Sequence, residues 1–143
     1  MPQSIAKLDP SAESPAAVRL AVGAGTAARA IACARRFAEA AALPEVSADR
    51  LAIVVEEWVN NVVEHGGPPA GSFLVLRLEQ VAGQVRAHFS DAGVAFDPRG
   101  ARAARPNLRR GGGAGLAFIA AWCQVEAYRR RRGRNRLVLR LRS

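Results

Sequence analysis

The chain has 143 residues, half of them hydrophobic, which is enough for one domain with a buried core and excludes a disordered tail. Its net charge of +9 is unevenly distributed. Residues 1–98 have a net charge of −3, whereas residues 99–143 carry 13 arginines and a single acid, Glu126, and have a net charge of +12. No apolar run approaches about 18 residues and the N-terminus has no secretory pattern, so we expect a cytoplasmic protein without a membrane-spanning helix.

Residues 1–16 show no periodicity and are expected to be a flexible tail, followed by one domain over residues 17–143. Alternating apolar residues predict a first strand over residues 18–22. Thr26 is expected to cap a helix that runs to about residue 42. The apolar face of that helix is expected to consist of Ile31, Ala34, Phe37 and Ala41.

A second helix is predicted over residues 48–64, capped by Ser47, with Leu51, Val55, Trp58 and Val62 facing the core. Strands over residues 72–79 and 84–90 form a predicted hairpin. A turn over residues 91–98 and a loop over residues 99–112 follow. The chain then ends with a short helix (114–122) and two strands (124–131 and 134–142). This order predicts the α+β class, with a mixed, mostly antiparallel sheet covered by helices on one face in a two-layer sandwich.

The second helix carries Glu57, Asn61 and His65, which are four residues apart and so lie on one stripe beside its apolar face. Taken alone, a solvated helix face explains them best. A carboxylate and an amide at the edge of a core are nevertheless suited to a general base and a magnesium ligand.

Two further motifs follow. Asp91-Ala92-Gly93 comes directly after a predicted strand, where an ordinary turn is the simplest interpretation. Residues 111–115 are glycine-rich and open a helix, where backbone amides can converge on a phosphate, although a flexible linker has the same composition. The two cysteines, Cys33 and Cys123, are isolated from each other and from histidine, so we expect buried, reduced thiols.

The order Glu-x3-Asn-x3-His, Asp-x-Gly, Gly-x-Gly-x-Gly resembles the GHKL ATP-binding superfamily, and its anti-sigma factor serine/threonine kinases in particular. Residues 57–66 look like the N box, residues 91–98 like the G1 box with its trailing Phe-Asp-Pro, and residues 111–119 like the G2 box. The similarity runs from about Val18 to Leu141. It implies a Bergerat-type fold, histidine-kinase-like, that binds ATP and Mg²⁺.

The resemblance also implies roles for individual residues. Glu57 would be the general base, Asn61 would bind Mg²⁺, and His65 would lie near the phosphates. Asp91 would accept a hydrogen bond from the adenine amino group, and Gly93 would let the adenine ring approach. The phosphate lid would comprise Gly111, Gly113, Gly115 and Leu116, with added charge from Arg109 and Arg110.

Two positions depart from the family pattern. Ala95 replaces a glycine that is frequent in the G1 box. Val138 stands where a threonine is common, which implies one hydroxyl fewer near the adenine. Neither departure removes the expected base or magnesium ligand.

The implied function is a bacterial anti-sigma factor kinase that phosphorylates a STAS-type anti-anti-sigma partner, sequesters a sigma factor and forms a homodimer. Alternatives are a partner-switch module without kinase activity and a stand-alone histidine-kinase-type ATPase domain. The net charge also suggests a nucleic-acid binder. The last third has few aromatic residues for stacking bases, so we expect no specific nucleic-acid binding and no membrane partner.

Overall fold

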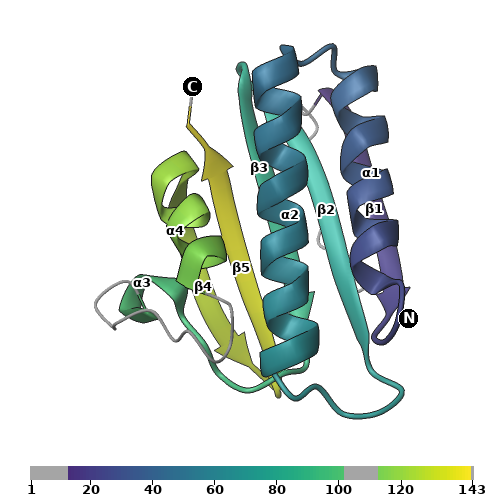
Figure 1. Ribbon diagram of the computed structural model, residues 1–143, viewed down its shortest axis with the longest axis vertical. Helices are drawn as coiled ribbons and strands as arrows, with labels where there is room; N and C mark the ends of the chain where they lie inside the picture. Colours follow the sequence, from purple (N-terminus) through teal and green to yellow (C-terminus); the bar gives the residue numbers. More distant parts are fainter. Residues whose placement is uncertain (1–12, 102–112, 143) are drawn as a thin grey trace.

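The computed structural model describes residues 13–101 and 113–142, which form five strands and four helices (Figure 1). The strands are β1 (Glu13–Ala21), β2 (Phe73–Val81), β3 (Gln84–Asp91), β4 (Cys123–Arg131) and β5 (Arg134–Leu141). The helices are α1 (Thr26–Ala40), α2 (Glu45–His65), α3 (Pro98–Ala101) and α4 (Gly113–Trp122). Apart from α3, which lies where a turn and a loop were expected, their order along the chain confirms the predicted order.

The strands form one sheet in the order β1-β2-β3-β5-β4. All four pairings between the described strands are antiparallel, so the sheet is more uniform than the mixed sheet we expected. The reason lies in the connections: two hairpins join β2 to β3 and β4 to β5, and α1 with α2 returns the chain to the sheet in the opposite direction. The α+β class is confirmed.

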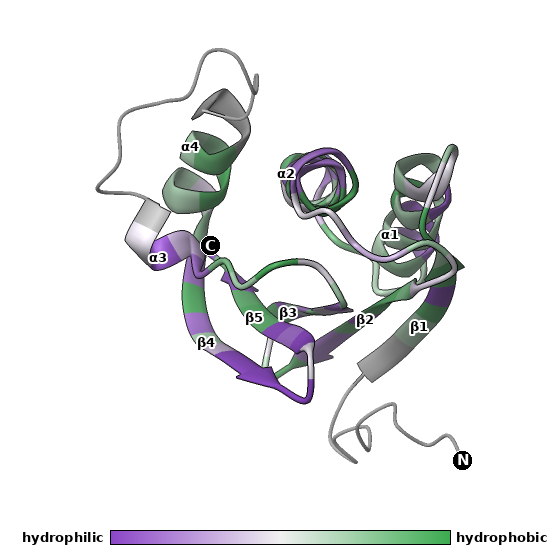
Figure 2. Cartoon of the chain, turned by 90° about the horizontal axis from the view of Figure 1, so that it is seen from below, coloured by the Kyte–Doolittle hydropathy of each residue, from purple (hydrophilic) through white to green (hydrophobic). Residues whose placement is uncertain are grey.

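The helices α1, α2 and α4 lie on one face of this sheet (Figure 2). Because side chains alternate along a strand, Leu74, Leu76 and Leu78 of β2 point to the helices and are fully buried. Trp58 and Phe37 are the largest side chains that the helices contribute to this core. The predicted core positions of α2 are all confirmed as buried: Leu51, Val55, Trp58 and Val62.

The starts of β1, α1 and α2 differ from the sequence prediction. Residues 13–16, assigned to the tail, begin β1 and pair with β2, whereas residues 1–12 lie outside the described part. Thr26 does not cap α1. Gly25 occupies that position. The Thr26 hydroxyl closes the preceding loop, because it accepts from the Gly23 amide and lies within hydrogen-bond distance of the Ala21 and Gly23 carbonyls, which share its one proton. Helix α2 begins at Glu45 behind Pro44, so Ser47 lies inside it.

The buried face of α1 is also rotated by one residue from the expected one. Ala30, Cys33, Ala34 and Phe37 are buried, while Ile31 is only half-buried. Both cysteines are buried and free, as predicted, and burial raises the pKa of the Cys123 thiol to about 12. Among the described helices, none combines the length and apolar character that crossing a bilayer requires.

Candidate functional site

Helix α2 presents Glu57, Asn61 and His65 along one half-buried stripe, as the four-residue spacing predicts. Burial raises the pKa of Glu57 above its usual value, and the neighbouring carboxylates of Glu56 and Glu64 raise it further. A carboxylate held in this way binds a proton more readily than a fully solvated one. Glu57 is therefore suited to accepting a proton from a reacting group.

Asp91 ends β3 with a carboxylate that is only 3% exposed. Its Oδ1 accepts hydrogen bonds from the backbone amide of Gly93 at 2.8 Å and from the Asn135 side chain at 3.1 Å. Among the described residues, no donor is bonded to Oδ2. Asp91 is thus fixed through one oxygen, while the other is available to accept a hydrogen bond from a ligand.

The turn after Asp91 meets the C-terminal end of α2. The Val94 amide donates to the Gly66 carbonyl at 2.8 Å, and a Cβ at Gly93 would lie 2.9 Å from that same carbonyl oxygen. A residue with a side chain would therefore push the two segments apart. Gly93 is needed here for close approach of two backbones, which joins the Asp91 turn to the helix that carries Asn61 and His65.

Aromatic side chains hold the rest of this turn against the same helix. Trp58 stacks on Phe96 with ring centroids 6.0 Å apart and also contacts Phe89 at 6.3 Å. Since Trp58 directly follows Glu57, the packing fixes the angular position of that residue relative to the turn. The Trp58 indole also makes its fluorescence a natural reporter for this region.

Asn135 of β5 is the polar centre of the site, and its role was missed from the sequence. It is 3% exposed and its amide donates to Asp91 Oδ1, to the Gly93 carbonyl at 3.2 Å and to the Val94 carbonyl at 2.8 Å. Its carbonyl accepts from the Tyr128 hydroxyl and from Arg130. One signal was present in the sequence: an asparagine at a core-facing position of a strand whose next such positions are leucine.

Two β4 residues extend this network. Arg130 donates to the Gly93 carbonyl at 2.8 Å, and the Tyr128 hydroxyl accepts from the Phe96 amide at 3.0 Å. The run of four arginines from residue 129 is therefore not uniformly a solvated surface. Arg130 points to the helix side of the sheet and holds the Asp91 turn.

The glycine-rich segment is only partly described. Gly113 and Gly115 lie in the first turn of α4, and Leu116 packs partly buried against the core. Gly111, Arg109 and Arg110 lie outside the described residues. The helix α4 packs beside α2, so its N-terminal turn belongs to the helix layer that carries Asn61.

Val138 corrects one expectation. It lies on the face of the sheet opposite to the helices, paired with His88, whereas Asp91 and Asn135 face the helix layer. The threonine that is common at this position in the family therefore has no bearing on the Asp91 site of this chain.

The donor set suits a nucleotide. Asp91 Oδ2 can accept a hydrogen bond from an amino group, and the lack of a side chain at Gly93 removes steric bulk beside it. The side-chain oxygen of Asn61 is a hard ligand for a divalent cation. In residues 13–101 and 113–142 no three His, Cys, Asp or Glu side chains converge as a metal cage.

Comparison with known proteins agrees with this geometry. Residues 12–141 match the family described as histidine kinase-like ATPase domain. A relative, the serine/threonine-protein kinase BtrW of Bordetella bronchiseptica, is 36% identical over 98 residues, which cover 62% of this chain and 66% of BtrW, just under two thirds of its length.

Two solved structures share the fold. The RsbU and RsbW domains of Rv1364c from Mycobacterium tuberculosis superpose with a TM-score of 0.63 at 18% identity, over 91% of this chain and 32% of that one. The SiaB-SiaC complex from Pseudomonas aeruginosa gives a TM-score of 0.57 at 15% identity, over 87% of this chain and 86% of the other. With the family match spanning almost its whole length, the chain belongs to the histidine kinase-like ATPase domain family.

Proposed function

We propose that this protein is an ATP-dependent serine/threonine kinase that phosphorylates a small protein partner. One observation carries the proposal. Asp91, a buried carboxylate with one oxygen that no described residue hydrogen-bonds, is fixed by the Gly93 contact to the end of the helix that bears Glu57 and Asn61. An acceptor for adenine, an oxygen ligand and a base are thereby held on adjoining elements. The kinase name of BtrW supports the same chemistry.

In this proposal Asp91 Oδ2 accepts a hydrogen bond from the adenine amino group, and Gly93 leaves space for the ring. Glu57 orients the hydroxyl of a serine or threonine on the partner and accepts its proton. The hydroxyl oxygen forms a bond to the γ-phosphorus while the bond to the β–γ bridging oxygen breaks, and ADP leaves. Such transfer depends mainly on positioning and charge neutralisation.

Asn61 is the proposed protein ligand of Mg²⁺, which supplies neutralisation of the triphosphate charge when bound. His65 lies one turn further along α2 on the same stripe, and we propose that it contacts the phosphates. The backbone amides of Gly111, Gly113 and Gly115, together with Leu116, are proposed as the lid over the phosphates.

The proposed partner is a STAS-type anti-anti-sigma protein, and the proposed regulatory output is sequestration of a sigma factor by a cytoplasmic homodimer of this chain. These assignments follow from the resemblance of the three motifs to anti-sigma factor kinases. The alternative is a module that binds ATP and its partners without transferring phosphate.

The deciding experiment is transfer of labelled γ-phosphate from ATP to purified STAS-domain proteins of the same genome. We expect Glu57→Gln to bind ATP as the wild type does but to lose transfer, because the base is gone while the nucleotide contacts remain. Glu45→Gln, at the exposed first turn of the same helix, is the matched control and should transfer normally.

Asp91→Asn tests the adenine contact separately, by calorimetry with Mg-ATP. An amide presents an oxygen and a donor where the wild type has only acceptors, so ATP should bind at least about tenfold more weakly, the loss of roughly one charged hydrogen bond. ATP binding without transfer by the wild type would favour the binding-only module. Equal transfer by Glu57→Gln would remove Glu57 as the base.

A further inference from the structure

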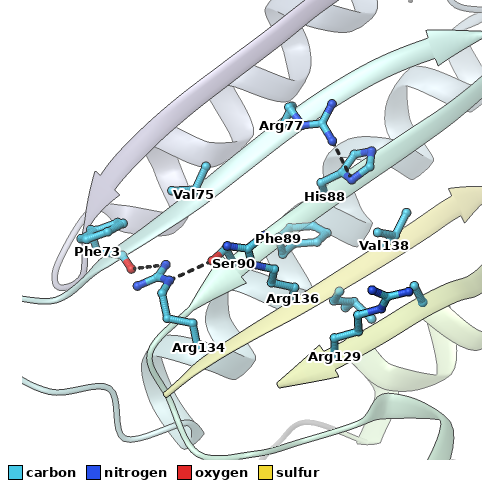
Figure 3. A pocket seen from close by; sticks show the side chains of 12 residues that line it. Phe73, Val75, Arg77, His88, Phe89, Ser90, Arg129, Arg134, Arg136 and Val138 are labelled. Carbon is cyan, nitrogen blue, oxygen red and sulfur yellow. Dashed lines mark hydrogen bonds between the residues drawn. The ribbon is translucent and has the colours of Figure 1, made fainter. Parts of the chain in front are cut away.

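The face of the sheet opposite to the helices carries a second candidate site. A depression of about 340 Å³ opens there across β2, β3, β5 and β4 (Figure 3). Its floor includes the aliphatic side chains of Val75, Ala127 and Val138, and arginines contribute to its lining. This site is separate from the Asp91 site, because neighbouring residues of a strand point to opposite faces.

On this face, arginines of β4 lie directly opposite arginines of β5. In the register of β4 and β5, Arg129 is opposite Arg136 and Arg131 is opposite Arg134. Like charges directly opposite each other destabilise a sheet. Among the described residues, no carboxylate forms an ion pair with any of these four guanidinium groups. In the part of the chain that the structure describes, the cluster therefore has no ion-paired counter-charge, and the charge of Asp91 on the other face of the sheet acts on Arg134 without pairing with it.

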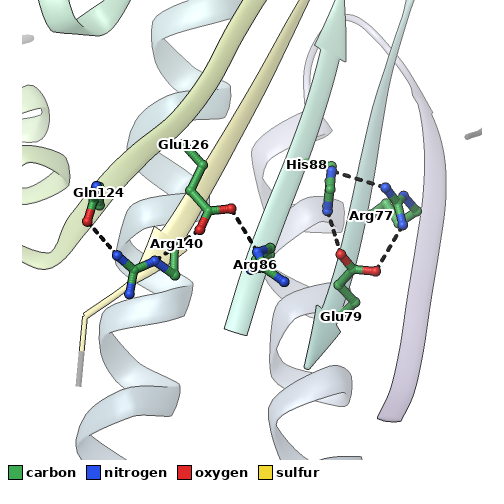
Figure 4. A network of polar contacts seen from close by, with 7 residues as sticks. All are labelled: Arg77, Glu79, Arg86, His88, Gln124, Glu126 and Arg140. Atoms are coloured by element: carbon green, nitrogen blue, oxygen red, sulfur yellow. Dashed lines mark hydrogen bonds and ion pairs between the residues drawn. The ribbon is translucent and has the colours of Figure 1, made fainter. Parts of the chain in front are cut away.

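Other charges on the same face are compensated (Figure 4). Glu79 forms an ion pair with Arg77 at 3.1 Å and a hydrogen bond with His88 Nε2 at 2.9 Å, and Glu126 forms ion pairs with Arg86 and Arg140. Acidic side chains of the sheet thus neutralise these arginines, in contrast to the four that lie opposite one another. Burial lowers the pKa of Arg134, the charge of Asp91 opposes this shift, and the charges of Arg136 and Arg19 add to it.

Phe73, which lines this depression together with the aromatic rings of His88 and Phe89, is already engaged. The guanidinium groups of Arg19 and Arg134 lie over the Phe73 ring at 3.6 and 4.3 Å from its centroid. A base that stacked on Phe73 would have to displace them. Binding of nucleic acid by stacking is therefore disfavoured, and an apolar floor with a cationic rim suits a ligand that is both aliphatic and acidic.

We propose that this open face binds an acidic, amphipathic segment of a partner protein. Aliphatic side chains of the segment would cover Val75 and Val138, and its carboxylates would pair with Arg129, Arg134 and Arg136. A second copy of this chain is a poor occupant, since it would bring the same uncompensated arginines against themselves. The inference goes beyond the proposed kinase function and does not depend on it.

The test uses a fluorescein-labelled nine-residue peptide of alternating glutamate and leucine, with binding followed by anisotropy. The double variant Arg129→Glu/Arg136→Glu should bind the peptide at least tenfold more weakly. The control Arg29→Glu/Arg36→Glu changes two exposed arginines of α1 and alters the net charge equally, so its affinity should change less than twofold. A peptide with glycine in place of leucine should bind several-fold more weakly to the wild type.

Circular dichroism establishes whether each variant folds, and Arg136→Gln replaces the double variant if that one does not. Equal losses in the two double variants, or no binding of either peptide to the wild type, would overturn the proposal. So would an oligouridylate that binds the wild type more tightly than the peptide and is released by the β4–β5 substitutions. A wild-type dimer that those substitutions dissociate in sedimentation would assign the face to a second copy instead. Mg-ATP calorimetry on the same variants keeps these outcomes distinct from a failure of the kinase proposal.

Discussion

Asn135→Asp changes one atom at the centre of the candidate site and reverses its hydrogen bonding. The wild-type amide nitrogen donates to Asp91 Oδ1 at 3.1 Å and to the carbonyls of Gly93 and Val94. In the variant, a carboxylate oxygen takes the place of that nitrogen and faces three acceptors. The substitution is almost isosteric, so its effect reports charge and hydrogen bonding rather than volume.

The magnitude follows from the 3.1 Å separation. Two unit charges at this distance repel by about 5 kcal/mol at an effective dielectric constant of about 20. The pair of carboxyl groups should therefore keep one proton in the folded protein. The unfolded chain releases that proton above about pH 4. Because the folded state then binds more protons than the unfolded state, the free energy of unfolding falls as the pH rises, by at most about 1.4 kcal/mol per pH unit.

Urea unfolding followed by tryptophan fluorescence measures this effect at pH 5 and pH 7.5. The free energy of unfolding of Asn135→Asp, relative to that of the wild type, should be up to about 3 kcal/mol lower at pH 7.5 than at pH 5. Asn135→Ala removes the same donor without adding a charge, so its deficit should be nearly equal at both pH values. If the two variants showed the same pH dependence, the contact between Asn135 and Asp91 would not be closed in solution, and the account of the site would be wrong.

Three further predictions use other parts of the structure. Gly93→Ala should destabilise the fold by about 1–3 kcal/mol in urea unfolding and weaken ATP binding in calorimetry, because its Cβ would meet backbone 2.9 Å away; Gly100→Ala, with open space around it, should change neither. Glu56→Gln removes a charge that raises the pKa of Glu57, so the acidic limb of the rate–pH profile should move to lower pH; an unmoved limb would exclude Glu57 as its source. Burial lowers the pKa of His88, so the folded protein binds a proton there less readily than the unfolded chain does. The free energy of unfolding should therefore fall as the pH drops below about 6.5. His88→Gln should reduce this dependence when unfolding is measured at pH 5.5 and 7.5.

The secondary structure was predictable because it depends on local periodicity. The helical spacing of Leu51, Val55, Trp58 and Val62 and the alternation in β2 and β3 placed the core correctly. The helix starts were not predictable in the same way. We expected serine or threonine caps, whereas α1 begins behind a left-handed glycine and α2 behind a proline, so their first turns have no side-chain cap.

The site was predictable where its parts are contiguous in the sequence. The four-residue spacing on α2 and the carboxylate at the end of β3 were recognised directly. Asn135 was not, because its role depends on the pairing that puts it opposite Asp91, 44 residues earlier in the chain. The close approach of Gly93 to Gly66, which leaves only 2.9 Å between the Gly66 carbonyl oxygen and a Cβ placed at Gly93, is equally a product of tertiary packing, and no local pattern contains it.

The arginine run at residues 129–132 shows how a compositional signal becomes two different structural features. Because β4 is extended, consecutive arginines point to opposite faces of the sheet. Arg130 points to the helix side, where it holds the Gly93 carbonyl, while Arg129 faces its cross-strand partner Arg136 on the open side. The net charge of the chain therefore cannot be assigned to one ligand. Part of it stabilises the turn that carries Asp91, and part forms an arginine cluster whose carboxylate partners, on our proposal, come from another protein.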